Sequence, residues 1–321
     1  MEDVTDELHF EDWGATYGSP YLIDEDAPGE DAELAEPVEP FARTPEPREV
    51  PDLAFVDGVR RVEGLVYHRG DDGLLARGVV GAHACGAVVV RANPGVAYER
   101  MRSRRMLILG SGRRAELSPT LGYGWESHAI ASADFDAPVM DLQRRMREAE
   151  ARLAEQLSAE GWLTIVDGPL NFVRSLDEPV VGYVKTHLRR RLPAELHARV
   201  PELGVGQRTP LFLARQSYSA YVRVAARGRH SSPWSGIVRI EVPESQGLAA
   251  ARDRADEVTC ALPRFAGVAH KDPRAPQNLL PIFALERQLR HRLGPADRAA
   301  RAIRLAVAGR DARASTNGAS A

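Results

Sequence analysis

The chain has 321 residues, of which 44% are hydrophobic and 27% charged, as expected for a folded protein with one large domain or two small ones. No apolar run approaches 18 residues, and the acidic N-terminus lacks a signal-peptide pattern, which predicts a cytoplasmic protein with no membrane span. Cys85 and Cys260 do not form a metal-type pair, so free thiols in a reducing compartment are the simple interpretation.

The net charge of −3 hides an uneven distribution. Residues 1–50 hold 16 acidic residues and two arginines, a net charge of −14, whereas the remaining chain has 40 basic and 29 acidic residues, a net charge of +11. The acidic segment has no sustained apolar period and is predicted to be a largely disordered arm that aids solubility, occupies a basic groove or docks a partner. The basic remainder is suited to a polyanion, and nucleic acid is the first candidate.

Ordered structure is expected from residue 51. The run 53–57 predicts a short buried strand that ends in Asp57-Gly58, and further strands are expected at 62–67, 74–90 and 107–110. The Arg-rich stretch 98–106 is predicted to be helical.

The second half of the chain alternates similar elements. Apolar residues three and four apart predict a helix over 139–160, and a buried strand over 163–167 ends in Asp167-Gly168. The remaining predicted elements are strands at 180–184, 211–214, 219–225 and 236–242, helices at 246–259, 279–293 and 297–308, and a polar tail at 311–321. We therefore expect an α/β fold with a mixed sheet flanked by helices, with one domain over 51–295 and a C-terminal helix and tail over 296–321.

Two strands that each deliver an aspartate are how RNase H-like enzymes build a metal site, and Asp57 and Asp167 fit that pattern. Carboxylate oxygens are preferred ligands of Mg²⁺ and Mn²⁺, and two such ions can flank a scissile phosphate. A third carboxylate is expected from the helix over 139–160. Helical geometry places Glu150 beside the apolar stripe, so we predict that Glu150 is this ligand; the alternative is an ion pair with Arg147.

Lys185 is one of only two lysines, the other being Lys271, and it follows a short strand close after Asp167. A compact ammonium group can approach a phosphate that is crowded by metal ions, so we predict that Lys185 contacts the substrate phosphate. Glu286 lies beside the apolar stripe of the helix over 279–293, which predicts that it faces the core or the metal site, with an ion pair to a nearby arginine as the alternative.

Several short motifs in this order resemble those of the NurA nucleases over about residues 51–295: Phe55-Val-Asp-Gly-Val59-Arg, Arg147-Glu-Ala-Glu150, Ile165-Val-Asp-Gly-Pro-Leu170, Val181-Gly-Tyr-Val-Lys185-Thr, Ser219-Ala-Tyr-Val-Arg223, Val238-Arg-Ile-Glu241 and Asn278-Leu-Leu-Pro-Ile-Phe-Ala-Leu-Glu286. The resemblance implies an RNase H-like fold, a homodimer, and Mn²⁺- or Mg²⁺-dependent cleavage of single- or double-stranded DNA. It also implies a hexameric HerA-type ATPase as the partner in DNA end processing and repair. Asp57, Glu150 and Asp167 would be the metal ligands.

The motifs depart from the family pattern at two positions. Val59 stands where the family has a small hydroxyl residue, and Glu286 stands where its last motif ends in histidine. These departures favour an alternative in which the protein is a catalytically weak or inactive scaffold that binds DNA or a translocase. A third interpretation is an RNase H relative directed at RNA.

Overall fold

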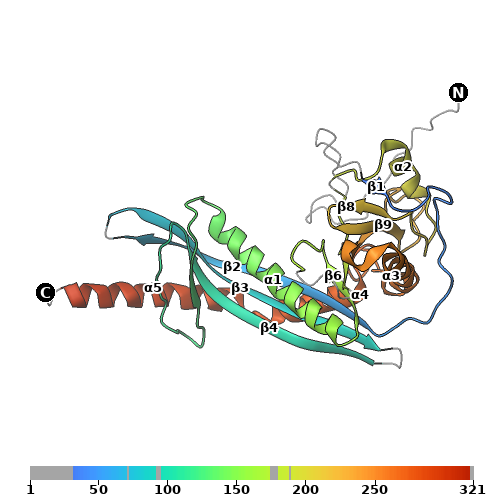
Figure 1. The fold of residues 1–321 in the computed structure, drawn as a ribbon. Helices are drawn as coiled ribbons and strands as arrows, with labels where there is room; N and C mark the ends of the chain where they lie inside the picture. The colour runs from blue at the N-terminus through green and yellow to red at the C-terminus, as the bar shows by residue number, and fades with distance from the viewer. Residues whose placement is uncertain (1–31, 71, 92–94, 174–179, 188, 319–321) are drawn as a thin grey trace. The chain divides into compact units, whose positions relative to one another are not determined.

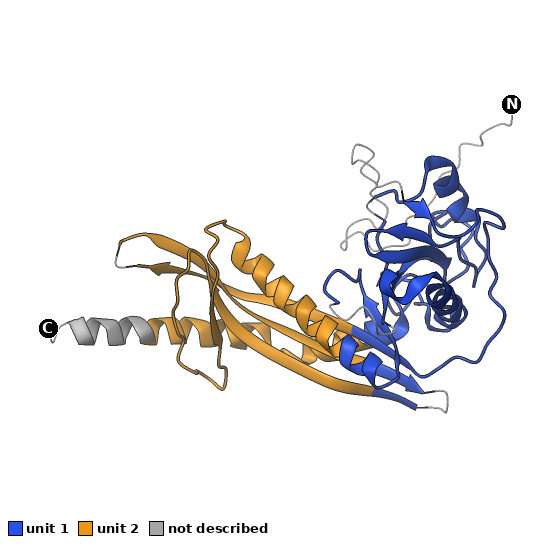
Figure 2. Cartoon of the chain, viewed as in Figure 1, with its two compact units in different colours: residues 1–56, 88–97, 154–284 blue, residues 57–87, 98–153, 285–321 orange. Residues whose placement is uncertain are grey.

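A computed structural model describes residues 32–70, 72–91, 95–173, 180–187 and 189–318. The chain divides into two compact units, which Figure 2 shows in separate colours. Unit 1 comprises residues 1–56, 88–97 and 154–284, and unit 2 comprises residues 57–87, 98–153 and 285–321. The boundary runs through single continuous elements, because strand β2 and helix α4 each begin in unit 1 and end in unit 2.

The described residues form a 10-stranded sheet in the order β1-β8-β9-β10-β7-β6-β2-β3-β4-β5. Strand β6 is parallel to β2 and β7, whereas β10 is antiparallel to β7 and β9, so the predicted mixed α/β sheet is confirmed. The strands are β1 (Glu33–Leu34), β2 (Leu53–Arg69), β3 (Leu75–Arg91), β4 (Gly95–Leu109), β5 (Glu126–Ala129), β6 (Leu163–Asp167), β7 (Val180–Val184), β8 (Phe212–Ala214), β9 (Ser217–Arg223) and β10 (Ile237–Pro243).

The α-helices are α1 (Ala137–Ala159), α2 (Ala194–Arg199), α3 (Gly247–Ala261), α4 (Leu280–Arg292) and α5 (Ala296–Gly318). In unit 1, one face of the sheet packs on α3 and on the first turn of α4, through residues such as Phe55, Ile165 and Val258. The opposite face carries a second core that includes Phe212, Tyr221 and Ile237. Figure 1 labels these helices.

In unit 2, helices α1 and α5 cover opposite faces of the long strands. Leu142 of α1 packs against Val79 and Ile108, whereas Ile303 of α5 packs against Val80 and Leu107. Because successive side chains of a strand point to opposite faces, this alternation places the two helices on the two sides of β3 and β4.

The part of the predicted acidic arm that the structure describes is packed onto unit 1. Residues Glu33–Leu34 form β1 against β8, and Glu36 is buried with hydrogen bonds from Arg208, Arg252 and the Leu211 amide. The arm was expected to be largely disordered over 1–50, but its segment 32–50 supplies a buried carboxylate that pairs with buried Arg208. The prediction for residues 1–31 lies outside the described residues.

Two sequence predictions are wrong, one of a helix and one of the end of a strand. The stretch predicted to be helical at 98–106 lies in β4, where exposed residues alternate with more buried ones. Strand β2 does not end at Asp57-Gly58 but continues to Arg69. The predicted helix over 139–160 and the strands over 163–167 and 180–184 are confirmed. No helix within the described ranges has the length and apolar character needed to cross a membrane.

Candidate metal centre

The register of two parallel strands places the two predicted aspartates side by side. Val56 of β2 pairs with Val166 of β6, and Asp57 and Asp167 each follow by one residue. The residues that precede the two aspartates are buried, because β2 and β6 lie inside the sheet and pack against α3. Asp57 itself is only 4% exposed. The buried apolar strands therefore carry both carboxylates to the same level of the sheet.

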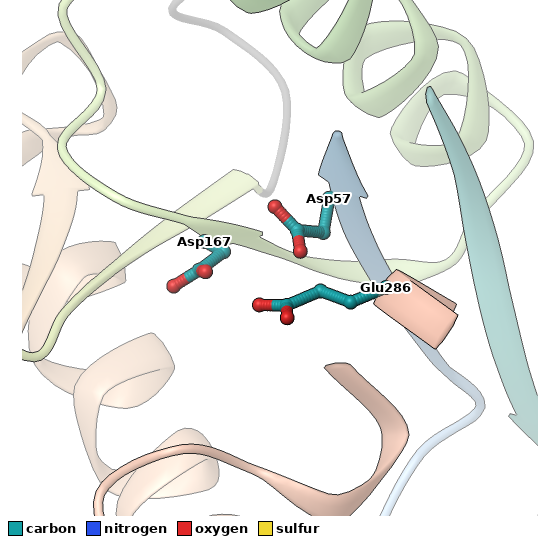
Figure 3. Close-up of side chains that lie close together, drawn as sticks. All are labelled: Asp57, Asp167 and Glu286. Carbon is teal, nitrogen blue, oxygen red and sulfur yellow. The ribbon is translucent and has the colours of Figure 1, made fainter. Parts of the chain in front are cut away.

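A third carboxylate comes from helix α4. One carboxylate oxygen from each of Asp57, Asp167 and Glu286 lies within 4.8 Å of the others, and Figure 3 shows the three side chains close together. Glu286 is 7% exposed and also accepts a hydrogen bond from Arg290 at 3.3 Å. The structure therefore brings together three of the four carboxylates that the sequence predicts at the site, and Glu286 is one of them.

Glu150, the predicted third ligand, does not belong to this carboxylate group among the described residues. It is buried on α1 and accepts a hydrogen bond from Arg147 at 2.9 Å, which is the ion pair that the sequence left as the alternative. Its carboxylate packs against Gly58, where an added Cβ would lie 2.2 Å from Glu150 Oε1. Glu150 thus lies beside the residue that follows Asp57, and its role as a ligand stays a prediction.

The glycines of the two Asp-Gly pairs have different physical explanations. Gly58 leaves room for the Glu150 carboxylate within a continuous strand. Gly168 has a φ of +122°, which side-chain-bearing residues rarely adopt, and it exchanges two backbone hydrogen bonds with Tyr183. The glycine after Asp167 therefore lies where its strand ends, whereas the glycine after Asp57 allows the Glu150 carboxylate to pack closely against a continuous strand.

Lys185 is part of the same site. Its Nζ donates hydrogen bonds to Asp167 Oδ2 at 2.6 Å and to Asn278 Oδ1 at 2.8 Å. The register of β6 and β7 explains this contact: Asp167 pairs with Tyr183, and Lys185 is two residues further along on the same face. Lys185 supplies positive charge at the carboxylate group.

Sequence reasoning missed the residues that orient Lys185. The Asn278 amide donates to Asp272 Oδ2 at 2.5 Å, and Asp272 is also paired with Arg274. Both Asn278 and Asp272 are at most 1% exposed, so the network is buried. Both residues are polar and lie in the segment just before α4. Their contact with Lys185 joins residues far apart in the sequence, so local sequence pattern does not predict it.

The donor set fits a hard divalent cation. Three carboxylates whose oxygens lie within 4.8 Å of one another repel, and Lys185 offsets only part of that charge. Carboxylate oxygen is the ligand type that Mg²⁺ and Mn²⁺ prefer. A cation held by Asp57, Asp167 and Glu286 would balance the repulsion and supply Lewis-acid activation of water or of a phosphate oxygen.

Burial makes His83, His187 and Cys85 unsuited to proton transfer at neutral pH. Burial lowers the pKa of His83 and of His187 to about 4. Burial, with the charge of Glu150 adding to it, raises the pKa of Cys85 to about 11, so its thiol stays protonated. Among the described residues of this site, the three carboxylates and Lys185 are the groups that could act on a substrate.

Neither a protein-family model nor a curated protein sequence matches this chain. The chain is similar in structure to the NurA nuclease from Sulfolobus solfataricus, with a TM-score of 0.45 and 11% sequence identity over 80% of this chain and 87% of that chain.

Proposed function

We propose that this protein is a metal-dependent nuclease that hydrolyses phosphodiester bonds of DNA. The observation that carries the proposal is the group of three carboxylates, Asp57, Asp167 and Glu286, with the ammonium of Lys185 against Asp167. Two of these carboxylates come from adjacent parallel strands, which is the arrangement that an RNase H-like metal site uses. The basic composition of residues 51–321, with a net charge of +11, suits a polyanionic substrate.

Each residue has a distinct task in this proposal. Asp57, Asp167 and Glu286 would hold Mn²⁺ or Mg²⁺, and such an ion would supply Lewis-acid activation of water and charge stabilisation at the leaving oxygen. Lys185 approaches a non-bridging oxygen of the phosphate and balances its charge, while Asn278 keeps the ammonium in place. Glu150 stays a candidate fourth ligand because it packs beside Gly58.

A scaffold without catalytic activity is the alternative that the departures from the NurA pattern favoured. The position of Glu286 now favours the enzyme, because the residue that replaces histidine contributes an oxygen to the carboxylate group. A homodimer and a HerA-type hexameric ATPase partner in DNA end processing complete the proposal. Both follow from the motif resemblance, and light scattering and co-purification with such an ATPase would test them.

The decisive experiment for the activity is cleavage of end-labelled single- and double-stranded DNA by the full chain with Mn²⁺, Mg²⁺ or EDTA. We expect cleavage with Mn²⁺ or Mg²⁺, none with EDTA, and a loss of at least about a hundredfold in Asp57→Asn and Asp167→Asn. A labelled RNA strand of the same sequence tests the RNA-directed alternative. Cleavage that persists in EDTA, or at the wild-type rate in both variants, would overturn the proposal.

A further inference from the structure

Unit 1 contains an arginine-lined cavity that the proposed chemistry does not use. Two adjoining hollows, of about 570 and 250 Å³, share Arg191, Arg215 and Arg239 in their walls. Arg189 lines the smaller hollow, and Glu241 is the acidic residue among the lining residues of the larger one. Among the described lining residues, four arginines stand against one glutamate, a net charge of +3.

Glu241, the acidic residue in the described lining, is already engaged. Glu241 Oε1 accepts a hydrogen bond from Arg239 at 2.6 Å, and Glu241 Oε2 accepts one from the Leu170 amide at 3.0 Å. His187 also lines the smaller hollow, and burial lowers its pKa to about 4, so it is neutral at physiological pH. Within the described lining, the excess positive charge is therefore carried by the arginines.

Arg239 has a buried guanidinium nitrogen that faces no acceptor among the described residues. It is 8% exposed, yet its Nε is buried and makes no hydrogen bond to any residue in the described part of the chain. A buried guanidinium N–H without an acceptor is costly, and a bound anion would satisfy it. Because Arg239 pairs with Val184 of β7, its side chain lies on the sheet face opposite to Tyr183 and Lys185. The cavity is thus separate from the Lys185–Asp167 contact.

Arg215 supports the same interpretation. It lies in the two-residue turn between β8 and β9 and has a φ of +58°, a conformation that is unfavourable for a residue with a side chain. Glycine or asparagine would relieve this strain, but arginine stands here and lines both hollows. Strained residues that line a charged cavity are typical of binding sites.

The cavity is also close to the proposed site along the chain. Its wall includes Pro169, Leu170 and Asn171, which follow Asp167 by two to four residues. Four residues of extended chain span at most about 14 Å, which equals the rise of about four nucleotides at ~3.4 Å per nucleotide in one DNA strand. The cavity wall at Asn171 is therefore no further from Asp167 than about four nucleotides can span, although Arg239 lies on the opposite face of the sheet.

We propose that the cavity formed by Arg191, Arg215 and Arg239 binds a phosphate group of the nucleic acid strand, a few nucleotides from the scissile bond. This inference rests on the proposed nuclease function for the identity of the ligand. Guanidinium groups bind phosphate oxygens with paired, charge-assisted hydrogen bonds, which suits arginine better than lysine. The phosphate belongs either to a strand end or to the internal backbone.

The test measures binding of labelled single-stranded DNA to the full chain in EDTA, where the carboxylate group cannot contribute catalysis. The oligonucleotides carry a 5′-phosphate, a 3′-phosphate or hydroxyl groups at both ends, and pyrophosphate is the competing probe. Arg215→Gln lies on an exposed turn, Arg239→Lys keeps the charge but removes the planar fork, and Arg264→Gln changes an exposed arginine outside the cavity.

We expect Arg215→Gln and Arg239→Lys to weaken DNA binding about tenfold and to reduce competition by pyrophosphate, while Arg264→Gln binds like the wild type. If removing one terminal phosphate weakens DNA binding by the wild type, but does not weaken binding by the variants any further, the ligand is a strand end. If the terminal phosphates make no difference, it is the internal backbone.

The inference is overturned if both cavity variants bind all oligonucleotides like the wild type. It is also overturned if they bind DNA more tightly, because the arginines would then hold the acidic N-terminal segment instead. These outcomes do not depend on cleavage. A protein that fails to cut DNA but shows the expected binding losses would refute the proposed nuclease function and leave the phosphate site standing.

Discussion

The Nζ of Lys185 lies 2.6 Å from Oδ2 of Asp167, and this contact joins one of the chain's two lysines to the carboxylate group. Lys185→Ala should lower cleavage about a hundredfold, because it removes a positioned charge next to the reacting phosphate. Lys271→Ala, which changes an exposed lysine, is the matched control and should cleave within about twofold of the wild type. Equal rates for the two variants would show that Lys185 has no special role.

Glu286 should matter through its carboxylate rather than through its ion pair. Glu286→Gln should reduce Mn²⁺-dependent cleavage about a hundredfold, whereas Glu286→His should retain more activity because imidazole also binds Mn²⁺. Arg290→Gln removes the ion-pair partner, which is 60% exposed, and should leave cleavage nearly unchanged. If Arg290→Gln loses as much activity as Glu286→Gln, Glu286 would act through its ion pair with Arg290 and not as a metal ligand. Glu150→Gln, measured alongside, reports on the predicted fourth ligand.

The sequence located the strand-borne part of the site because that part depends on local pattern. A buried apolar run followed by aspartate is visible for both Asp57 and Asp167, and the scarcity of lysine singled out Lys185. The sequence pattern does not distinguish Glu150 from Glu286 as the third carboxylate of the site, because each borders the apolar stripe of its own helix. Their difference arises from tertiary packing, which puts Glu150 against Gly58 and Glu286 at the carboxylate group.

Strand β4 shows a second limit of local pattern. Arginine and methionine favour helices, so residues 98–106 looked helical. In the structure the side chains of Arg100, Arg102 and Arg104 alternate outward along a strand, and the pairing of β4 in the sheet outweighs propensity. Asn278 and Asp272 were likewise invisible as site residues, because only folding brings them to Lys185.

The buried carboxylate of Glu36 should make folding stability depend on acid pH. Burial alone would raise the pKa of Glu36, but hydrogen bonds from Arg208, the Leu211 amide and Arg252 together lower it from 4.5 to about 2. A lowered pKa in the folded state means that the stabilisation is complete above about pH 4.5 and is lost as the pH falls toward 2.

Urea unfolding at a series of pH values tests this expectation. Glu36→Gln should lower the free energy of unfolding by about 3 kcal/mol at pH 7 and flatten its fall between pH 4.5 and 2. Glu33→Gln, which changes an exposed residue of β1, should keep the wild-type profile. Parallel profiles for Glu36→Gln and the wild type would contradict the assignment.

The acidic segment at the N-terminus should compete with DNA for the basic remainder of the chain. Residues 1–31 contain 11 acidic residues and no lysine or arginine. Removing residues 2–31 should tighten DNA binding severalfold at low salt, and the gain should shrink as salt screens the attraction. A variant of full length with these acids changed to asparagine and glutamine separates charge from length. Unchanged affinity of both variants at low salt would leave partner docking as the role of this segment.

The central claim is that Asp57, Asp167 and Glu286 together bind a divalent cation, and calorimetric titration of the full chain with Mn²⁺ tests it most directly. The wild type should bind Mn²⁺, and Asp57→Asn and Asp167→Asn should each weaken binding at least about tenfold, because each removes a ligand charge. Asp253→Asn, which changes an exposed carboxylate on α3, should bind like the wild type. Absence of Mn²⁺ binding by the wild type, or wild-type affinity in both site variants, would contradict the account.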